Sequence, residues 1–137
     1  MLTVVLASRT SGNLSSRLDS LLDSVNDNTN SEEKKQIEFI IKFDSDDTVP
    51  PFIINSPYPF RIKWTQYSRG EGRYDLYNFI NYLVTLRDEK SRFVMTMADD
   101  FIVKRPFVSE IINRKSTYRI IGGANNPIFG DNLIVPI

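Results

Sequence analysis

Short apolar runs alternate with amphipathic segments along this chain. Thr3–Ala7 and Ile37–Phe43 are rich in apolar residues, which is typical of strands buried on both faces. Between them, leucines and a valine recur at i, i+4, i+7, i+8 and i+11 from Leu14 to Val25, the spacing of one helical face. Asp23–Lys35 is rich in Asp, Asn, Ser, Glu and Lys, and it predicts a solvated loop.

The alternation continues beyond the second predicted strand. Pro50, Pro51, Pro57 and Pro59 argue against a helix and predict an extended connection. Arg61–Thr65 alternates polar and apolar residues, as half-buried or edge strands do. The rest of the pattern predicts an amphipathic helix over Arg73–Arg87, a strand over Phe93–Met97, a short helix from Pro106 through Ile112 and a fifth strand over Tyr118–Ile121.

The order of these elements predicts the fold class. Strands that alternate with amphipathic helices form a mainly parallel, Rossmann-like α/β sheet with helices on both faces. A chain of 137 residues suits one such domain, over residues 1–137. Ligands of such sheets bind in the crevice beyond the carboxyl ends of the strands. We therefore look for chemistry in the residues that directly follow each strand.

Two residue types are missing, because the chain has no Cys and no His. Their absence excludes disulfides, Cys- or His-ligated metals, a cysteine nucleophile and a Ser-His-Asp triad. Any metal must then be bound by oxygen ligands, which favours Mg²⁺, Mn²⁺ or Ca²⁺.

Charge and hydropathy narrow the function classes further. Basic and acidic residues number 17 each, so no net field attracts nucleic acid. The apolar stretches are too short to span a bilayer, and the N-terminus lacks the basic and long apolar regions of a signal peptide. We expect a cytoplasmic protein without a transmembrane segment or a nucleic-acid partner.

Acidic and basic side chains follow several of the predicted strands. Carboxylates that lie close together repel one another unless a cation, a proton or an arginine is present. Arginine can also bind a phosphate through two hydrogen bonds. The pattern therefore indicates a phosphorylated ligand with Mg²⁺ or Mn²⁺, although the aspartates are also good turn formers and the arginines alone could be solvated surface. The candidate residues are Ser8, Arg9, Asp44, Asp46, Arg69, Asp99 and Asp100.

These strand ends resemble the nucleotide-binding half of a GT-A glycosyltransferase of the family 2-like type. The resemblance covers residues 1 to about 124 and rests on short motifs: Val4–Arg9, the Leu-rich Arg17–Leu22, Asp44–Asp47, Ser68–Gly70 with Tyr77–Asn78, and Met97–Asp100 in place of an Asp-x-Asp motif. It implies a GT-A-like fold and a nucleoside diphosphate sugar as donor. The acceptor would be an unknown glycan, lipid or protein, and an oligomer is possible.

The resemblance also implies roles for the candidate residues. Ser8 and Arg9 would lie near the nucleotide, with Arg9 and Arg69 on its phosphates. Asp44 or Asp46 would accept a hydrogen bond from the base. Asp99 and Asp100 would hold Mn²⁺ or Mg²⁺ on the diphosphate, where the ion neutralises charge on the leaving group.

Two departures from the family pattern limit what it implies. Met97 stands where the first Asp of Asp-x-Asp is expected. The sequence also stops where the acceptor-binding half would begin, and in inverting members the general base lies in that half. The catalytic residues are therefore unknown, and the chain is expected to be a truncated or minimal donor-binding domain. A non-catalytic remnant of a glycosyltransferase is a further interpretation.

A competing resemblance comes from haloacid dehalogenase-like phosphatases. Phe43–Val49 resembles their first motif, a strand followed by Asp-x-Asp-x-Thr. That reading makes Asp44 the nucleophile, Asp46 the acid/base, and the Asp99–Asp100 pair the Mg²⁺ ligands. Against it, the motif normally follows the first strand of its fold, and Asp47 stands where a glycine is usual.

Overall fold

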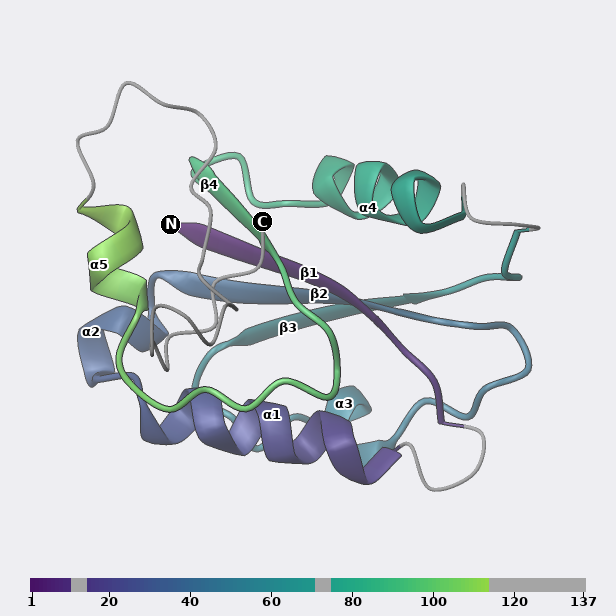
Figure 1. Cartoon of the computed structure of the whole chain (residues 1–137), viewed down its shortest axis with the longest axis horizontal. Helices are drawn as coiled ribbons and strands as arrows, with labels where there is room; N and C mark the ends of the chain where they lie inside the picture. Colours follow the sequence, from purple (N-terminus) through teal and green to yellow (C-terminus); the bar gives the residue numbers. More distant parts are fainter. Residues whose placement is uncertain (11–14, 71–74, 114–137) are drawn as a thin grey trace, which may run out of the picture.

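A four-stranded parallel sheet forms the centre of the molecule (Figure 1). The structure is a computed structural model, and it describes residues 1–10, 15–70 and 75–113. The strands are β1 (Leu2–Ser8), β2 (Ile37–Phe43), β3 (Arg61–Gln66) and β4 (Phe93–Thr96), in the order β3-β2-β1-β4. The mainly parallel α/β fold expected from the sequence is confirmed, and so is the edge position of β3.

Two long helices cover opposite faces of the sheet. α1 (Ser15–Asp27) connects β1 to β2, and α4 (Asp75–Thr85) connects β3 to β4. These two connections step across the sheet in opposite directions. Because such crossovers are right-handed, their helices must lie on opposite faces, and Figure 1 shows the sheet between α4 and α1.

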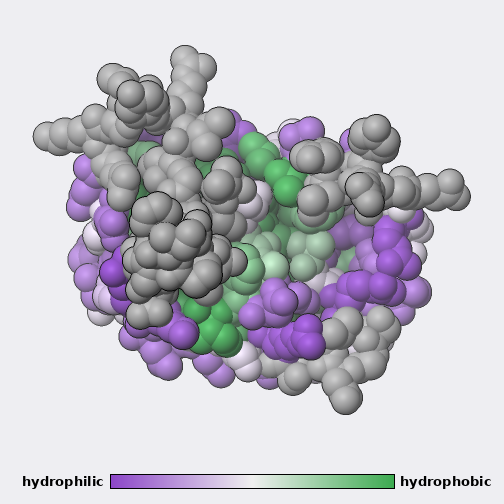
Figure 2. All heavy atoms as spheres, viewed as in Figure 1, coloured by the Kyte–Doolittle hydropathy of each residue, from purple (hydrophilic) through white to green (hydrophobic). Residues whose placement is uncertain are grey.

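The core is divided between the two faces because side chains alternate along each strand. Leu2, Val4 and Leu6 of β1 pack with the buried leucines of α1 in the larger cluster. Val5 faces the other way and packs with Ile40 of β2 and Leu83 of α4. Figure 2 shows hydrophobic side chains along the middle of the molecule with hydrophilic ones around them.

The polar segment after α1 folds into more helix than the sequence predicted. α1 continues to Asp27, and a short helix α2 (Ser31–Lys34) follows it. Asn30 and Glu33 form a capping box, in which each side chain binds the other residue's backbone N–H. The prediction of a solvated loop over Asp23–Lys35 is therefore wrong. The overlooked signal was the three-residue spacing of Asn30 and Glu33, which is typical of a capping box at the start of a helix.

A short helix also forms at Pro50 and Pro51, where the sequence analysis predicted an extended connection. α3 (Pro51–Ile54) begins with Pro50 at its N-cap and Pro51 in its first turn. Proline is tolerated there, because the first backbone N–H groups of a helix have no partner within it. By contrast, α5 (Val108–Ile112) begins after Pro106, with Phe107 as its N-cap, so Pro106 is not part of its first turn.

A buried glutamate forms hydrogen bonds and an ion pair that connect several strands near the amino edge of the sheet. Glu38 is fully buried, and its Oε1 accepts hydrogen bonds of 2.7 Å from the Thr3 hydroxyl and from the Asp88 backbone N–H. Its Oε2 lies 3.1 Å from the Lys63 ammonium. These contacts link β1, β2, β3 and the segment before β4 on the face covered by α4.

The described residues contain no helix with the length and apolar character needed to cross a membrane. The predicted fifth strand, Tyr118–Ile121, lies outside the described residues.

The strand order determines where a ligand site is expected. After β1 the chain moves to β2 on one side, and it later returns to β4 on the other side. The carboxyl ends of the neighbouring strands β1 and β4 are therefore a topological switch point, where the crossover segments on the two faces diverge and a ligand crevice is expected.

Candidate functional site

A hydrogen bond joins the carboxyl ends of β1 and β4 at the switch point. The Ser8 hydroxyl donates to Asp99 Oδ2 over 2.9 Å. Ser8 is buried as the last residue of β1, whereas Asp99 is half-buried in the turn that the Phe101 N–H closes on the Ala98 carbonyl. The sheet thus brings together two candidate residues that are far apart in the sequence.

A second group of candidate residues surrounds Asp44 at the end of β2. One carboxylate oxygen of Asp44 pairs with the Lys42 ammonium. The other lies 3.4 Å from Arg9 Nε and 3.9 Å from Arg69 Nε. The Asp44 side chain is only 8% exposed, while those of Arg9 and Arg69 are 41% and 55% exposed. The arginines therefore remain accessible to an anion.

Backbone hydrogen bonds hold the loop after β2 in place. Asp47 accepts the backbone N–H of Thr10 on Oδ1 at 3.0 Å and that of Asp44 on Oδ2 at 2.9 Å. The Gln66 amide donates to the carbonyls of Asp44 and Asp47 at 3.0 and 2.7 Å. The turn interpretation of this aspartate-rich motif is therefore correct for Asp47, which organises the loop.

Lys42 is the site residue that sequence reasoning missed. It lies inside β2, is buried, and its ammonium also sits 4.7 Å from the centre of the Tyr67 ring. A buried lysine needs a countercharge, and Asp44 supplies it. The available signal was a lysine in a mainly apolar strand, two residues before an aspartate, where both side chains leave the same face.

Carboxylates follow β2 and β4 at the carboxyl edge of the sheet. Oxygens of Asp44, Asp46 and Asp47 lie within 4.8 Å of one another and could hold a metal ion. In that set both Asp47 oxygens already accept backbone N–H groups, and Asp44 is paired with Lys42. The other set is Asp99, with one oxygen on Ser8, and the exposed Asp100. Asp99 therefore keeps one carboxylate oxygen that the Ser8 hydroxyl does not occupy.

Asp100 lines a pocket between α1 and the segment after β4. This pocket has a volume of about 490 Å³, and Arg17, Ser20 and Ile102 also line it. Met97, which replaces the first aspartate of the expected motif, is buried in the core beneath α1. It therefore serves packing and offers no metal ligand.

The candidate residues thus form two neighbouring groups along one edge. Ser8 and Asp99 lie at the carboxyl ends of β1 and β4, and Asp44 with Arg9 and Arg69 lies at the ends of β1 to β3. Asp46 is exposed beside the second group. Partly exposed arginine side chains and carboxylates on one edge can bind an anion and a divalent cation together.

Comparison with solved structures identifies a protein of the same fold. S. aureus TarS, a GT-A-type glycosyltransferase, matches 81% of this chain at 15% identity with a TM-score of 0.58. Residues 1–349 of TarS in complex with UDP match 81% of this chain at 13% identity with a TM-score of 0.55. The chain has a GT-A-type fold, as the resemblance implied.

The chain spans 18% and 30% of the lengths of those two TarS structures. No protein-family model matches the sequence. A comparison with curated proteins also finds no match.

Proposed function

We propose that the carboxyl edge of this sheet binds a nucleoside diphosphate sugar together with Mn²⁺ or Mg²⁺. The observation that carries the proposal is the Ser8–Asp99 hydrogen bond at the carboxyl ends of β1 and β4, together with the partly exposed side chains of Arg9 and Arg69 on the same edge. The GT-A-type fold, which this chain shares with a TarS structure in complex with UDP, supports it.

Each residue has a role that follows from its surroundings. Asp99 would hold the ion through the oxygen that Ser8 leaves open, with Asp100 as the second carboxylate. Arg9 and Arg69 would bind the diphosphate, because each has a side chain that is at least 41% exposed and a carboxylate near its Nε that orients it. The bound ion would act as a Lewis acid on the diphosphate and stabilise it as a leaving group.

The transfer reaction itself is a wider proposal. It would move a sugar from the nucleotide to a glycan, lipid or protein acceptor, and we assign no general base among the described residues. We further propose that residues 1–137 form one donor-binding domain. The chain could act as a transferase or as a donor-binding remnant without transferase activity. These two proposals differ only in the transfer step, so both predict that the chain binds the nucleotide.

The phosphatase alternative fits the strand order poorly. It needs Asp44 and Asp99 on one metal ion, but β1 lies between the strands that precede them. Adjacent strands are about 4.8 Å apart, so the ends of β2 and β4 are separated by roughly 10 Å. Asp44 is also engaged by Lys42, Arg9 and Arg69, which reduces its nucleophilicity.

A thermal-shift panel tests the proposed function. The protein is heated with UDP, GDP, CDP, dTDP or a phosphate monoester, each with and without Mn²⁺. We expect one nucleoside diphosphate to raise the melting temperature only when Mn²⁺ is present, because ligands of the folded state stabilise it by mass action. Stabilisation by no nucleotide would contradict the proposal, and hydrolysis of the monoesters would favour the phosphatase.

A further inference from the structure

The segment between β4 and α5 carries both aspartates of the proposed metal site. Residues 97–107, which we call the strap, leave the carboxyl end of β4 and run along α1 before they reach α5 (Figure 1). Asp99 and Asp100 lie in the first turn of the strap, which the Phe101 N–H closes on the Ala98 carbonyl over 3.1 Å. The positions of the two carboxylates therefore depend on what holds the strap in place.

Two polar side chains at the end of α1 bind the backbone of the strap at Val103. The Ser24 hydroxyl accepts the Val103 N–H over 2.9 Å and donates to the Leu21 carbonyl over 2.7 Å. The Asn28 amide donates to the Val103 carbonyl over 3.1 Å and to the Ser24 carbonyl over 2.8 Å. Both backbone groups of Val103 are thus satisfied by side chains, although this residue lies outside the sheet.

This contact is shielded from water. Ser24 is 9% exposed and Val103 is 4% exposed, and the Val103 side chain packs in the core cluster beneath α1. A buried N–H that loses its acceptor costs more free energy than the hydrogen bond itself contributes. We therefore expect the strap to shift away from α1 when the Ser24 hydroxyl is removed.

A second fixed point lies at the far end of the strap. The N-cap of α5 is Phe107, whose side chain makes no capping hydrogen bond. Glu33 of α2 takes this role, because its Oε2 accepts the N–H and the hydroxyl of Ser109, both over 3.0 Å. The strap is thus held at residue 103 and at its end, so its movement is limited to the turn that carries the aspartates.

Val103 is close enough to the aspartates for its anchoring to matter. Asp100 and Val103 are three positions apart, which is at most about 11 Å of chain. On the other side of the turn, the Ser8 hydroxyl binds Asp99 over 2.9 Å. The two carboxylates therefore lie between one contact to β1 and one contact to α1.

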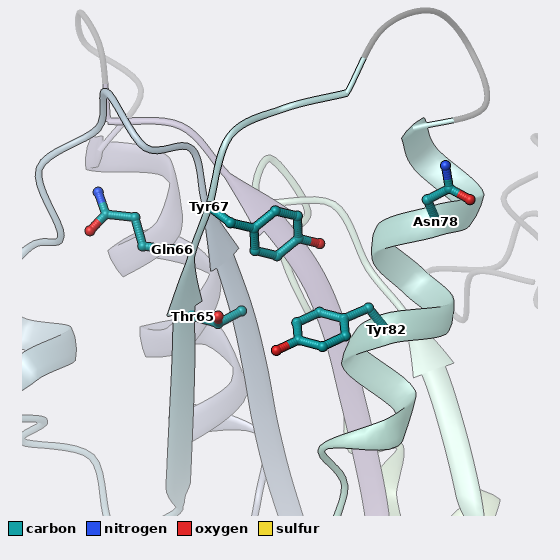
Figure 3. A pocket seen from close by; sticks show the side chains of 5 residues that line it. All are labelled: Thr65, Gln66, Tyr67, Asn78 and Tyr82. Atoms are coloured by element: carbon teal, nitrogen blue, oxygen red, sulfur yellow. The ribbon is translucent and has the colours of Figure 1, made fainter.

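The charged group around Asp44 is supported from the other face of the sheet. Tyr67, which follows β3, and Tyr82 of α4 point toward one another in Figure 3, and their rings meet edge to face with centroids 5.5 Å apart. The Lys42 ammonium, which pairs with Asp44, lies 4.7 Å from the centre of the Tyr67 ring. Because α4 supplies this support, changes at the end of α1 should leave the surroundings of Asp44 unchanged.

We infer that Ser24 and Asn28 are positioning residues for the divalent ion, because they fix the strap that presents Asp99 and Asp100. Neither side chain touches the ion or the nucleotide, and both act through the backbone of Val103. The inference rests on the proposed function, since it concerns the same metal site, but it assigns residues outside that site.

Two substitutions test the inference through the affinity for Mn²⁺ at saturating UDP, measured by calorimetry. Ser24→Ala removes the acceptor of the Val103 N–H, and Asn28→Ala removes the donor to its carbonyl. Each should lower the Mn²⁺ affinity on the order of 10-fold, the lower end of the range for residues that orient metal ligands. Ser24→Thr keeps the hydroxyl and should bind Mn²⁺ like the wild type. An equal loss for Ser24→Thr would assign the effect to packing and contradict the inference.

A second readout needs no metal. In ¹⁵N spectra of the protein without Mn²⁺ or UDP, Ser24→Ala should shift the backbone amide signals of Asp99 and Val103. The signals of Lys42 and Tyr67 should stay in place, because α4 supports that part of the edge. A shifted Val103 signal with an unchanged Asp99 signal would show that the contact does not reach the aspartates, and would overturn the inference.

Ile37→Val is the stability control, because it removes one buried methylene from the core at the start of β2, away from the carboxyl edge. It should melt at a lower temperature but bind Mn²⁺ like the wild type. If Ser24→Ala and Asn28→Ala bind Mn²⁺ as tightly as Ile37→Val, their hydrogen bonds only stabilise the fold and the inference is wrong. If the wild type with UDP binds no Mn²⁺, the proposed function fails, and the inference fails with it.

Discussion

Asp99→Asn is expected to lower the affinity for UDP in the presence of Mn²⁺ by roughly 10- to 100-fold, the range for losing a contact to a charged group. The substitution removes the negative charge but keeps an oxygen that can accept from the Ser8 hydroxyl, 2.9 Å away in the wild type. The fold should therefore persist while the cation loses its main ligand. Calorimetric titration with UDP, with and without Mn²⁺, measures the effect.

Two further variants test whether the loss of UDP affinity is specific to the carboxylate of Asp99. Asp27→Asn removes one charge from the exposed C-terminal end of α1, away from the carboxyl edge, and should leave UDP affinity unchanged. Asp46→Asn probes the other carboxylate set. A loss for Asp46→Asn with none for Asp99→Asn would move the metal to the loop after β2 and contradict our assignment.

Lys42→Met should lower the free energy of unfolding by about 3 kcal/mol, the lower end of the range for breaking a buried ion pair. Lys42 and Asp44 have side chains that are 3% and 8% exposed, so removal of the ammonium leaves a buried carboxylate without its partner. Arg9, with Nε 3.4 Å from the other oxygen, limits the loss. Urea denaturation at neutral pH measures it.

A double variant separates the ion pair from simple packing. Lys42→Met combined with Asp44→Asn removes both charges, so it should be more stable than Lys42→Met alone. Lys35→Met is the control, because the side chain of Lys35 is 73% exposed and its pair with Glu32 should contribute little. Equal stability of Lys42→Met and the wild type would show that the pair does not stabilise the fold.

Local patterns were enough to predict most of the fold. Each strand of the sheet and both long helices follow from apolar runs and helical periodicity, because one face of every element must be buried. Errors arose where local rules have exceptions: Pro51 began a helix, and Asn30 with Glu33 capped another. Both are terminal positions, at which proline and polar side chains are favourable.

The site was less predictable because it depends on strand order. The sequence indicates that Ser8, Asp44 and Asp99 follow parallel strands, and therefore share one edge. It does not indicate that β1 lies between β2 and β4, which places Asp99 beside Ser8 and apart from Asp44. The pairing of Lys42 with Asp44 and the meeting of Tyr67 with Tyr82 also depend on packing that no single segment determines.

Paramagnetic broadening by Mn²⁺ tests the central claim most directly. Nuclear magnetic resonance spectra of the ¹⁵N-labelled protein with UDP are recorded while Mn²⁺ is added in small amounts, and the nearest backbone amide signals disappear first. We predict that the signals of Ser8 and Asp99 disappear first, and only when UDP is present. Earlier loss of the Asp46 and Asp47 signals, with a sharp Asp99 signal, would contradict a metal–nucleotide site between β1 and β4.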